Sequence, residues 1–140
     1  MTREELIENI DRSWNAWLDA LDGIPAGRTG EPGVCGDYSV KDLIGHIAFW
    51  DEQDLARAQK LARGEDVQPN DWQSMNDREF EAHKDDTLAQ QTERMHASHA
   101  RLVADTLVLD RIDALKLDET WPHYDEHRNE VLAWRNAQGV

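Results

Sequence analysis

The residues best suited to chemistry lie in the segment HYDEHRNEV, residues 123–131, where two histidines stand four positions apart beside two carboxylates. An α-helix turns by about 100° per residue, so His123 and His127 would lie about 40° apart on successive turns. Two imidazoles placed in this way can bind one zinc-like ion through their ring nitrogens. A chance pair of histidines on a polar helix face has the same spacing, so a third ligand must decide between the two interpretations.

His46 is the strongest candidate for that third ligand. It lies in the segment SVKDLIGHIAFWDE, residues 39–52, about 60° around a helix from Leu43 and therefore at the edge of an apolar stripe. A histidine satisfied by a hydrogen bond in the core would occupy the same position. Three protein ligands with an open position are typical of catalytic metal sites. The other histidines are predicted to flank the apolar face or to face solvent: His83, His96 and His99.

Glu126 is the candidate proton acceptor. Together with the two histidines it completes the pattern H-x-x-E-H, the inverted zinc-peptidase signature, in which the glutamate activates a water at the metal. Peptidases of that type are much larger proteins, so we retain the chemistry and set the peptidase identity aside. The alternative is that Glu126, like Asp125, only complements the positive end of a helix in its first turn.

Three aromatic residues are candidates for a substrate pocket. Trp72 falls in a predicted loop and could line a pocket mouth, and Tyr124, next to His123, could donate a hydrogen bond to a substrate. Trp50 belongs to the same helix as His46, although a tryptophan there is also typical of a core residue. Cys35 has no cationic neighbour in its glycine-rich loop and is predicted to be an unreactive thiol.

The first two helices that must position these residues have clear ends. Thr2 and Glu5 fit a capping box, and the apolar residues then recur at helical spacing as far as Leu21. A loop rich in glycine and proline follows. Ser39 caps the second helix, and Gly64 is its natural stop.

The later helices are less sharply bounded. The third is predicted to start near Asn76, with Glu79 completing a capping box, and to run for about 30 residues, a length that leaves room for a kink or break. Pro122 suits the first turn of a fourth helix. Its predicted core contacts are Val131, Leu132 and Trp134.

These elements predict an all-α fold, a four-helix bundle in which residues 1–140 form a single domain. The sequence shows no alternating β pattern and no internal repeat. The connection after Gly64 is longer than most links between helices. Since a long connection can return along the bundle, helices two and three are predicted to run parallel.

Composition narrows the classes of partner. The net charge is −14, which argues against nucleic acid and against an anionic membrane surface, and leaves neutral or cationic small molecules and metal ions. A single cysteine excludes an internal disulfide. No apolar run approaches the roughly 20 residues that a membrane-spanning helix needs. We therefore expect a cytoplasmic location.

The order of these segments resembles the DinB-like superfamily of bacterial four-helix bundles, which includes the YfiT-type metal-dependent hydrolases and thiol-dependent transferases. Residues 36–52, GDYSVKDLIGHIAFWDE, are similar to the second helix of that family. Residues 123–134, HYDEHRNEVLAW, are similar to its fourth helix, which carries H-x-x-x-H, and residues 2–21 are similar to its first.

The resemblance implies that the second and third helices are parallel and that a divalent metal, often zinc or nickel, is held by His46, His123 and His127. It also implies a homodimer in many members. Activities in the family include transfer or isomerisation with low-molecular-weight thiols and, in the ClbS-like branch, hydrolytic protection against a reactive natural product. Two features depart from the thiol-dependent members. The chain has no clear second domain, and only single cations, such as Arg57 and Arg128, could face an anionic thiol.

The leading hypothesis is a small-molecule enzyme, a hydrolase or a thiol-dependent transferase, that serves in detoxification or stress protection. A divalent ion on the three histidines would activate water or a thiol near neutral pH. The alternative is a non-enzymatic protein that sequesters a small molecule in a cavity lined with tryptophan. A third interpretation is an interaction protein with histidines on its surface.

Overall fold

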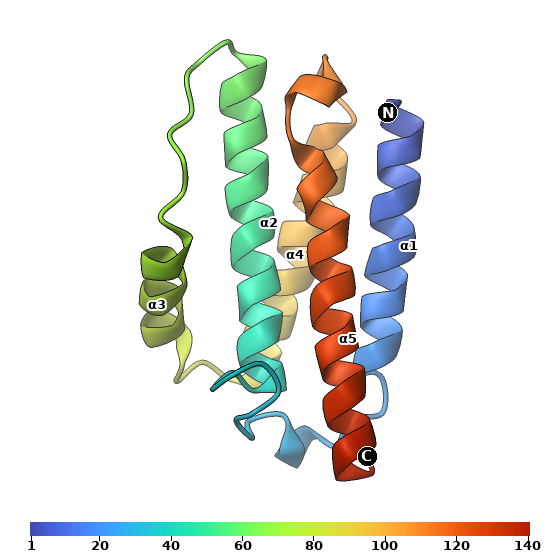
Figure 1. Cartoon of the computed structure of the whole chain (residues 1–140), viewed down its shortest axis with the longest axis vertical. Coiled ribbons are helices and arrows are strands. Elements are labelled where there is room, and N and C mark those ends of the chain that lie inside the picture. Colours follow the sequence, from blue (N-terminus) through green and yellow to red (C-terminus); the bar gives the residue numbers. More distant parts are fainter.

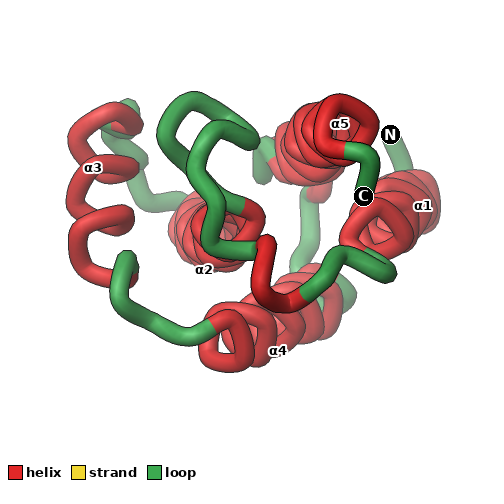
Figure 2. The backbone as a smooth tube through the Cα atoms, turned by 90° about the horizontal axis from the view of Figure 1, so that it is seen from below, coloured by secondary structure: helices red, strands yellow, loops and turns green.

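Four long helices make up the bundle, and a fifth, shorter helix lies outside it (Figures 1 and 2). The computed structural model describes all residues, 1–140. The long helices are α1 (Arg3–Leu21), α2 (Val40–Ala62), α4 (Leu88–Thr106) and α5 (Thr120–Gln138). The outer helix is α3 (Trp72–His83), and short 3₁₀ turns lie at Ala26–Arg28, Ile112–Ala114 and Leu117–Glu119. The chain forms no strand, and no helix combines the length and apolar character needed to cross a membrane.

Helices α2 and α4 run in the same direction, from the lower to the upper end of the bundle in Figure 1. Their contacts rise together in residue number, because Glu52 pairs with Arg94 while Gln59, further along α2, donates to Asp105. This is the orientation predicted from the long connection after Gly64. The connection descends along the outside of α2 and carries α3.

Helices α1 and α5 form the second parallel pair. Trp14 packs against Tyr124 with ring centroids 5.4 Å apart, and the carbonyl of Ala20 accepts a hydrogen bond of 2.9 Å from Arg135. Seen from below in Figure 2, the four long helices surround one core and α3 stands apart beside α2.

The first two helices start where the sequence predicts. Thr2 and Glu5 form a reciprocal capping box, as do Ser39 and Asp42, so the first orphan backbone N–H groups of α1 and α2 are satisfied by side chains. Pro122 lies in the first turn of α5, as expected for a residue without a backbone donor.

The predicted start of the third helix near Asn76 is wrong, and a break, for which its predicted length left room, divides it in two. Helix α3 begins four residues earlier, capped by Asp71, and the chain breaks after His83 before α4 begins. The break needs no glycine or proline, because Thr87 and Gln90 form a capping box that starts a new helix. Asn76 and Glu79 therefore lie inside α3 and form no cap.

The core fills the space between the four long helices. Its largest fully buried side chain is Trp17, and Trp14 and Trp134 are also buried. Leu132 was predicted to join this core but is 46% exposed, because the neighbouring Val131 occupies the inward face and a one-residue step turns the side chain by about 100°.

Helix α3 is attached to the bundle by polar and aromatic contacts, and none of its residues is fully buried. Three pairs hold it: Tyr38 with Phe80, Trp50 with Asn76, and Arg94 with Glu79. The first pair stacks with centroids 5.2 Å apart, and the Trp50 indole donates a hydrogen bond of 2.7 Å. As a result, α3 forms a wall beside α2.

Candidate metal centre

Three histidines from two helices converge at one point. His46 lies on α2, and His123 and His127 lie one turn apart on α5. The Nε2 atom of His123 is 3.1 Å from Nε2 of His46 and 2.9 Å from Nε2 of His127. One nitrogen from each ring falls within 4.8 Å of the others. The fold thus brings together the three residues that the sequence analysis selected as metal ligands.

The surroundings keep all three imidazoles neutral. Burial lowers the pKa of His46 to about 3 and that of His123 to about 4. The pKa of His127 falls to about 2, mainly through burial and then because a proton on His127 would be repelled by any proton on His123 or His46. A neutral imidazole presents the lone pair that a metal requires.

The spacing of the nitrogens fits one tetrahedral ion. Metal–nitrogen bonds of about 2.0–2.1 Å at tetrahedral angles place two ligand nitrogens about 3.3 Å apart. The contacts of His123 with His46 and His127 are slightly shorter than this distance. Three nitrogen donors leave at least one position for a small molecule, which is the pattern of catalytic sites.

Glu130 and Cys35 lie behind His127, on the side of the ring facing away from the other histidines. The Nδ1 atom of His127 is 3.3 Å from Oε1 of Glu130, and the two groups are not aligned for a hydrogen bond. Both Nδ1 and the second oxygen of Glu130 are buried without a hydrogen-bond partner. A small rotation would let Nδ1–H donate to this carboxylate, the usual support for a metal-binding histidine.

Cys35 is close to this pair but is held as a thiol. Its sulfur, a ring nitrogen of His127 and a carboxylate oxygen of Glu130 lie within 4.8 Å of one another. Burial, followed by the neighbouring carboxylate of Glu130, raises the pKa of Cys35 to about 12. This agrees with the prediction of an unreactive thiol, because the thiolate is the nucleophilic form.

An open cleft of about 1100 Å³ leads to the three histidines. Trp50 and Trp72, two of the three residues predicted for a substrate pocket, line this cleft, and Trp72 is 60% exposed. Glu126 also lines the cleft and forms no ion pair or hydrogen bond with another side chain. The α3 wall separates the cleft from solvent on one side.

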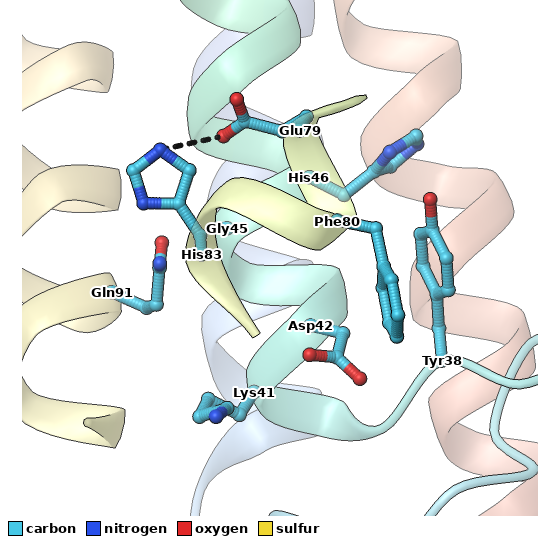
Figure 3. A pocket seen from close by; sticks show the side chains of 9 residues that line it. All are labelled: Tyr38, Lys41, Asp42, Gly45, His46, Glu79, Phe80, His83 and Gln91. Atoms are coloured by element: carbon cyan, nitrogen blue, oxygen red, sulfur yellow. Dashed lines mark ion pairs between the residues drawn. The ribbon is translucent and has the colours of Figure 1, made fainter. Parts of the chain in front are cut away.

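A much smaller cavity of about 20 Å³ lies on the other side of His46, between α2, α3 and α4 (Figure 3). Gln91 reaches into it from α4 and is 2% exposed. A Cβ atom at Gly45 would approach the Gln91 amide oxygen to 2.6 Å, so the glycine that precedes His46 admits this side chain. In Figure 3 the ring of His46 points away from the cavity, toward α5.

The family model of the mycothiol maleylpyruvate isomerase N-terminal domain matches residues 10–135. The chain belongs to this family. Searches of curated proteins and of solved structures found no match. The mycothiol maleylpyruvate isomerase N-terminal domain is a domain of the DinB-like superfamily, so the resemblance inferred from residues 36–52 and 123–134 is confirmed.

The structure corrects the prediction for Tyr124 in this DinB-like domain. Tyr124 is fully buried and does not line the cleft. It follows His123 directly, and the step of about 100° turns it from the cleft into the core. There it donates a hydrogen bond of 2.6 Å to Asp51 and lies 3.2 Å from Nδ1 of His99.

The remaining histidines of the DinB-like domain lie away from the cluster. His96 is exposed, as predicted, and His83 contacts Glu79 and Asp86. His99 is buried and stacks on Trp14 with centroids 3.7 Å apart, whereas the sequence predicted it at the edge of the apolar face.

Sequence reasoning missed the approach of Glu130 to His127. The spacing of three residues from His127 was a usable signal, since positions i and i+3 face each other on a helix. The approach of Cys35 had no such signal, because its loop lies far from α5 in the sequence.

Proposed function

We propose that this DinB-like domain is a divalent-metal-dependent enzyme acting on a small molecule in the cleft above His46, His123 and His127. The observation that carries the proposal is the convergence of three neutral imidazole nitrogens at the floor of an open cleft. A divalent ion held there supplies Lewis acidity, which makes a water or a thiol nucleophilic at neutral pH.

The side chains around the cleft have separate roles in this proposal. His46 and the two α5 histidines hold the ion, and Trp50 and Trp72 bind the apolar part of the substrate. Glu126 accepts the proton that the nucleophile loses, because its carboxylate faces the cleft and has no other partner.

The family name favours a thiol as the nucleophile, with mycothiol the example that it prints. A low-molecular-weight thiol is therefore the proposed co-substrate, and hydrolysis by water is the second form of the same chemistry. Arg57 is the one basic side chain lining the cleft and is already paired with Asp54 and Glu119. For this reason maleylpyruvate, an organic anion, is not proposed as a substrate of this chain.

The first test is the metal content of protein purified without a histidine tag. Wild-type protein is expected to carry close to one equivalent of zinc or nickel, and a His123→Ala variant less than a tenth of that, because two nitrogens bind far more weakly than three. His96→Ala, which removes an exposed histidine outside the cluster, serves as the control and should match wild type. Equal metal content in wild type and His123→Ala would refute the metal centre.

A second test addresses Glu130. Glu130→Ala is expected to weaken metal binding by about 10–100-fold, the usual effect of losing the group behind a ligating histidine. Glu130→Gln keeps an oxygen acceptor for Nδ1–H and should lose less. Competition titration against a chromophoric chelator measures both. Asp125→Asn, on the same helix but paired with Arg128, is the control. An unchanged affinity in Glu130→Ala would show that the carboxylate has no influence on His127.

The size of the cleft and its tryptophans favour a second candidate, a protein that sequesters a toxic small molecule without converting it. The two candidates differ in thiol consumption in the presence of an electrophile. An enzyme consumes the thiol, and does so much more slowly after treatment with a chelator. A sequestering protein gives the same slow rate before and after chelation.

A further inference from the structure

The cleft above the three histidines has a strongly one-sided charge. Six carboxylates and one guanidinium line it. The carboxylates belong to Asp37, Asp54, Asp77, Asp118, Glu119 and Glu126. They come from the loop before α2, from α2, α3 and α5, and from the 3₁₀ turn before α5, so they surround the cleft instead of clustering on one helix face.

The single guanidinium does not offset this charge at the centre of the cleft. Arg57 lies 3.3 Å from Asp54 and 3.3 Å from Glu119, so two of the six carboxylates already neutralise it. The other four form no ion pair. A divalent ion on the histidines would offset two negative charges, and the cleft would remain acidic.

Aromatic rings accompany the carboxylates. Trp50, Trp72 and Tyr38 line the same cleft, and the exposure of Trp72 leaves the face of a large indole open to a ligand. An organic cation gains from both features, because it is attracted by the carboxylates and by the electron-rich faces of aromatic rings. An anion of the same shape gains from neither.

We propose that the cleft selects an organic cation, a small amine bearing an apolar or aromatic group, as the substrate. The inference rests on the proposed function only in taking this cleft as the substrate site. Trp50 and Trp72 contact the apolar group, while Asp77 of α3 and Asp118 of the 3₁₀ turn before α5 attract the ammonium. These two carboxylates set which charge the site accepts and leave the histidines to the chemistry.

The test compares two probes that share a phenol ring and a two-carbon chain and differ in charge: tyramine and 3-(4-hydroxyphenyl)propanoate. Isothermal titration calorimetry on the metal-loaded protein at pH 7.5 and low salt is expected to show tyramine binding at least tenfold more tightly. The preference should shrink at 0.5 M salt, because ions screen the attraction.

Two double variants, each lacking two carboxylates, test whether the preference for tyramine comes from the charge of the cleft. An Asp77→Asn/Asp118→Asn variant should lower the ratio of affinities at least threefold. A Glu4→Gln/Glu8→Gln variant removes the same charge from α1, which does not line the cleft, and should leave the ratio unchanged. Repeating the titrations on metal-free His123→Ala separates the two proposals, since selection of the cation does not depend on the ion.

Three outcomes would overturn the inference. The first is a carboxylate probe that binds as tightly as tyramine, and the second is an equal change of the ratio in both charge variants. The third is no binding of either probe up to millimolar concentration. Loss of the metal centre with the tyramine preference intact would refute the proposed function alone.

Discussion

Replacing Tyr124 with alanine is expected to lower the free energy of unfolding by about 4–5 kcal/mol, and replacement with phenylalanine by about 2 kcal/mol. The larger change removes a fully buried ring from the centre of the bundle. The smaller change removes only the hydroxyl, so it isolates the polar contribution of this residue.

The physical reason is a buried polar chain across three helices. The Tyr124 hydroxyl donates to Asp51 of α2 and lies beside His99 of α4, which stacks on Trp14. Burial raises the pKa of Asp51 well above its usual value, which marks a carboxyl group deprived of solvent. Without the hydroxyl, this group would be left buried and unpaired, at a cost that exceeds one ordinary hydrogen bond.

Urea unfolding followed by circular dichroism measures both changes. The chain has two tyrosines, and the other one supplies a matched control. Tyr38 stacks on Phe80, but its hydroxyl forms no hydrogen bond with the protein, so Tyr38→Phe should change stability by less than about 0.5 kcal/mol. Equal effects of the two Tyr→Phe changes would contradict the structural role of the Tyr124–Asp51 bond.

The second large effect is expected on acidification. Metal-free protein should lose about 2–3 kcal/mol of stability between pH 6 and pH 5, a substantial part of the 5–15 kcal/mol typical of a domain. The cause is four histidines whose pKa is lowered in the folded state: about 3 for His46, about 4 for His99 and His123, and about 2 for His127.

The direction follows from where the protons bind. Below the ordinary histidine pKa of about 6.5, the unfolded chain takes up protons that the folded protein refuses, so folding becomes less favourable as the pH falls toward the lowered values. Two aspartates act in the opposite sense. Burial raises the pKa of Asp54 to about 6 and that of Asp51 well above its usual value, so both favour the folded state as they are protonated. They offset about half of the histidine effect.

Urea titrations at several pH values, with a chelator present, measure this dependence. A His99→Gln variant should lose less stability on acidification, by close to 1.4 kcal/mol per pH unit, the contribution of one fully shifted group. His96→Gln changes an exposed residue whose charge is the lesser cause of the lowered His99 pKa, so it should alter the dependence much less than His99→Gln. Stability that stayed constant from pH 7 to pH 5 would contradict the neutral, buried state of these histidines.

The sequence predicted the helices wherever a local signal was strong. Capping boxes at Thr2 and Ser39 marked the starts of α1 and α2, because capping depends only on neighbouring residues. A break before α4 was allowed for but not placed, although Thr87 and Gln90 carry the same signal, since the apolar residues on both sides suggested a continuous helix. The capping pair determined the structure there.

The residues of the candidate site also differ in whether a local sequence pattern could predict their positions. His123 and His127 could be paired from their spacing, because one helix determines their geometry. His46 needed the family resemblance, since its approach to α5 depends on how two helices pack. Tyr124 was misplaced because adjacent residues on a helix face different environments, and periodicity in this polar segment was too weak to decide which residue faced inward.

Helix α3 contributes to the lining of the cleft but little to the buried core of the bundle. It supplies Trp72 and Asp77 to the cleft but buries none of its residues fully, and Asn76 and Glu79 anchor it through part-buried polar contacts. Mutations along α3 can therefore reshape the pocket wall while the bundle and the histidine cluster stay intact. The lining of the cleft on this side thus depends on one short segment of the DinB-like domain that contributes no fully buried residue to the core.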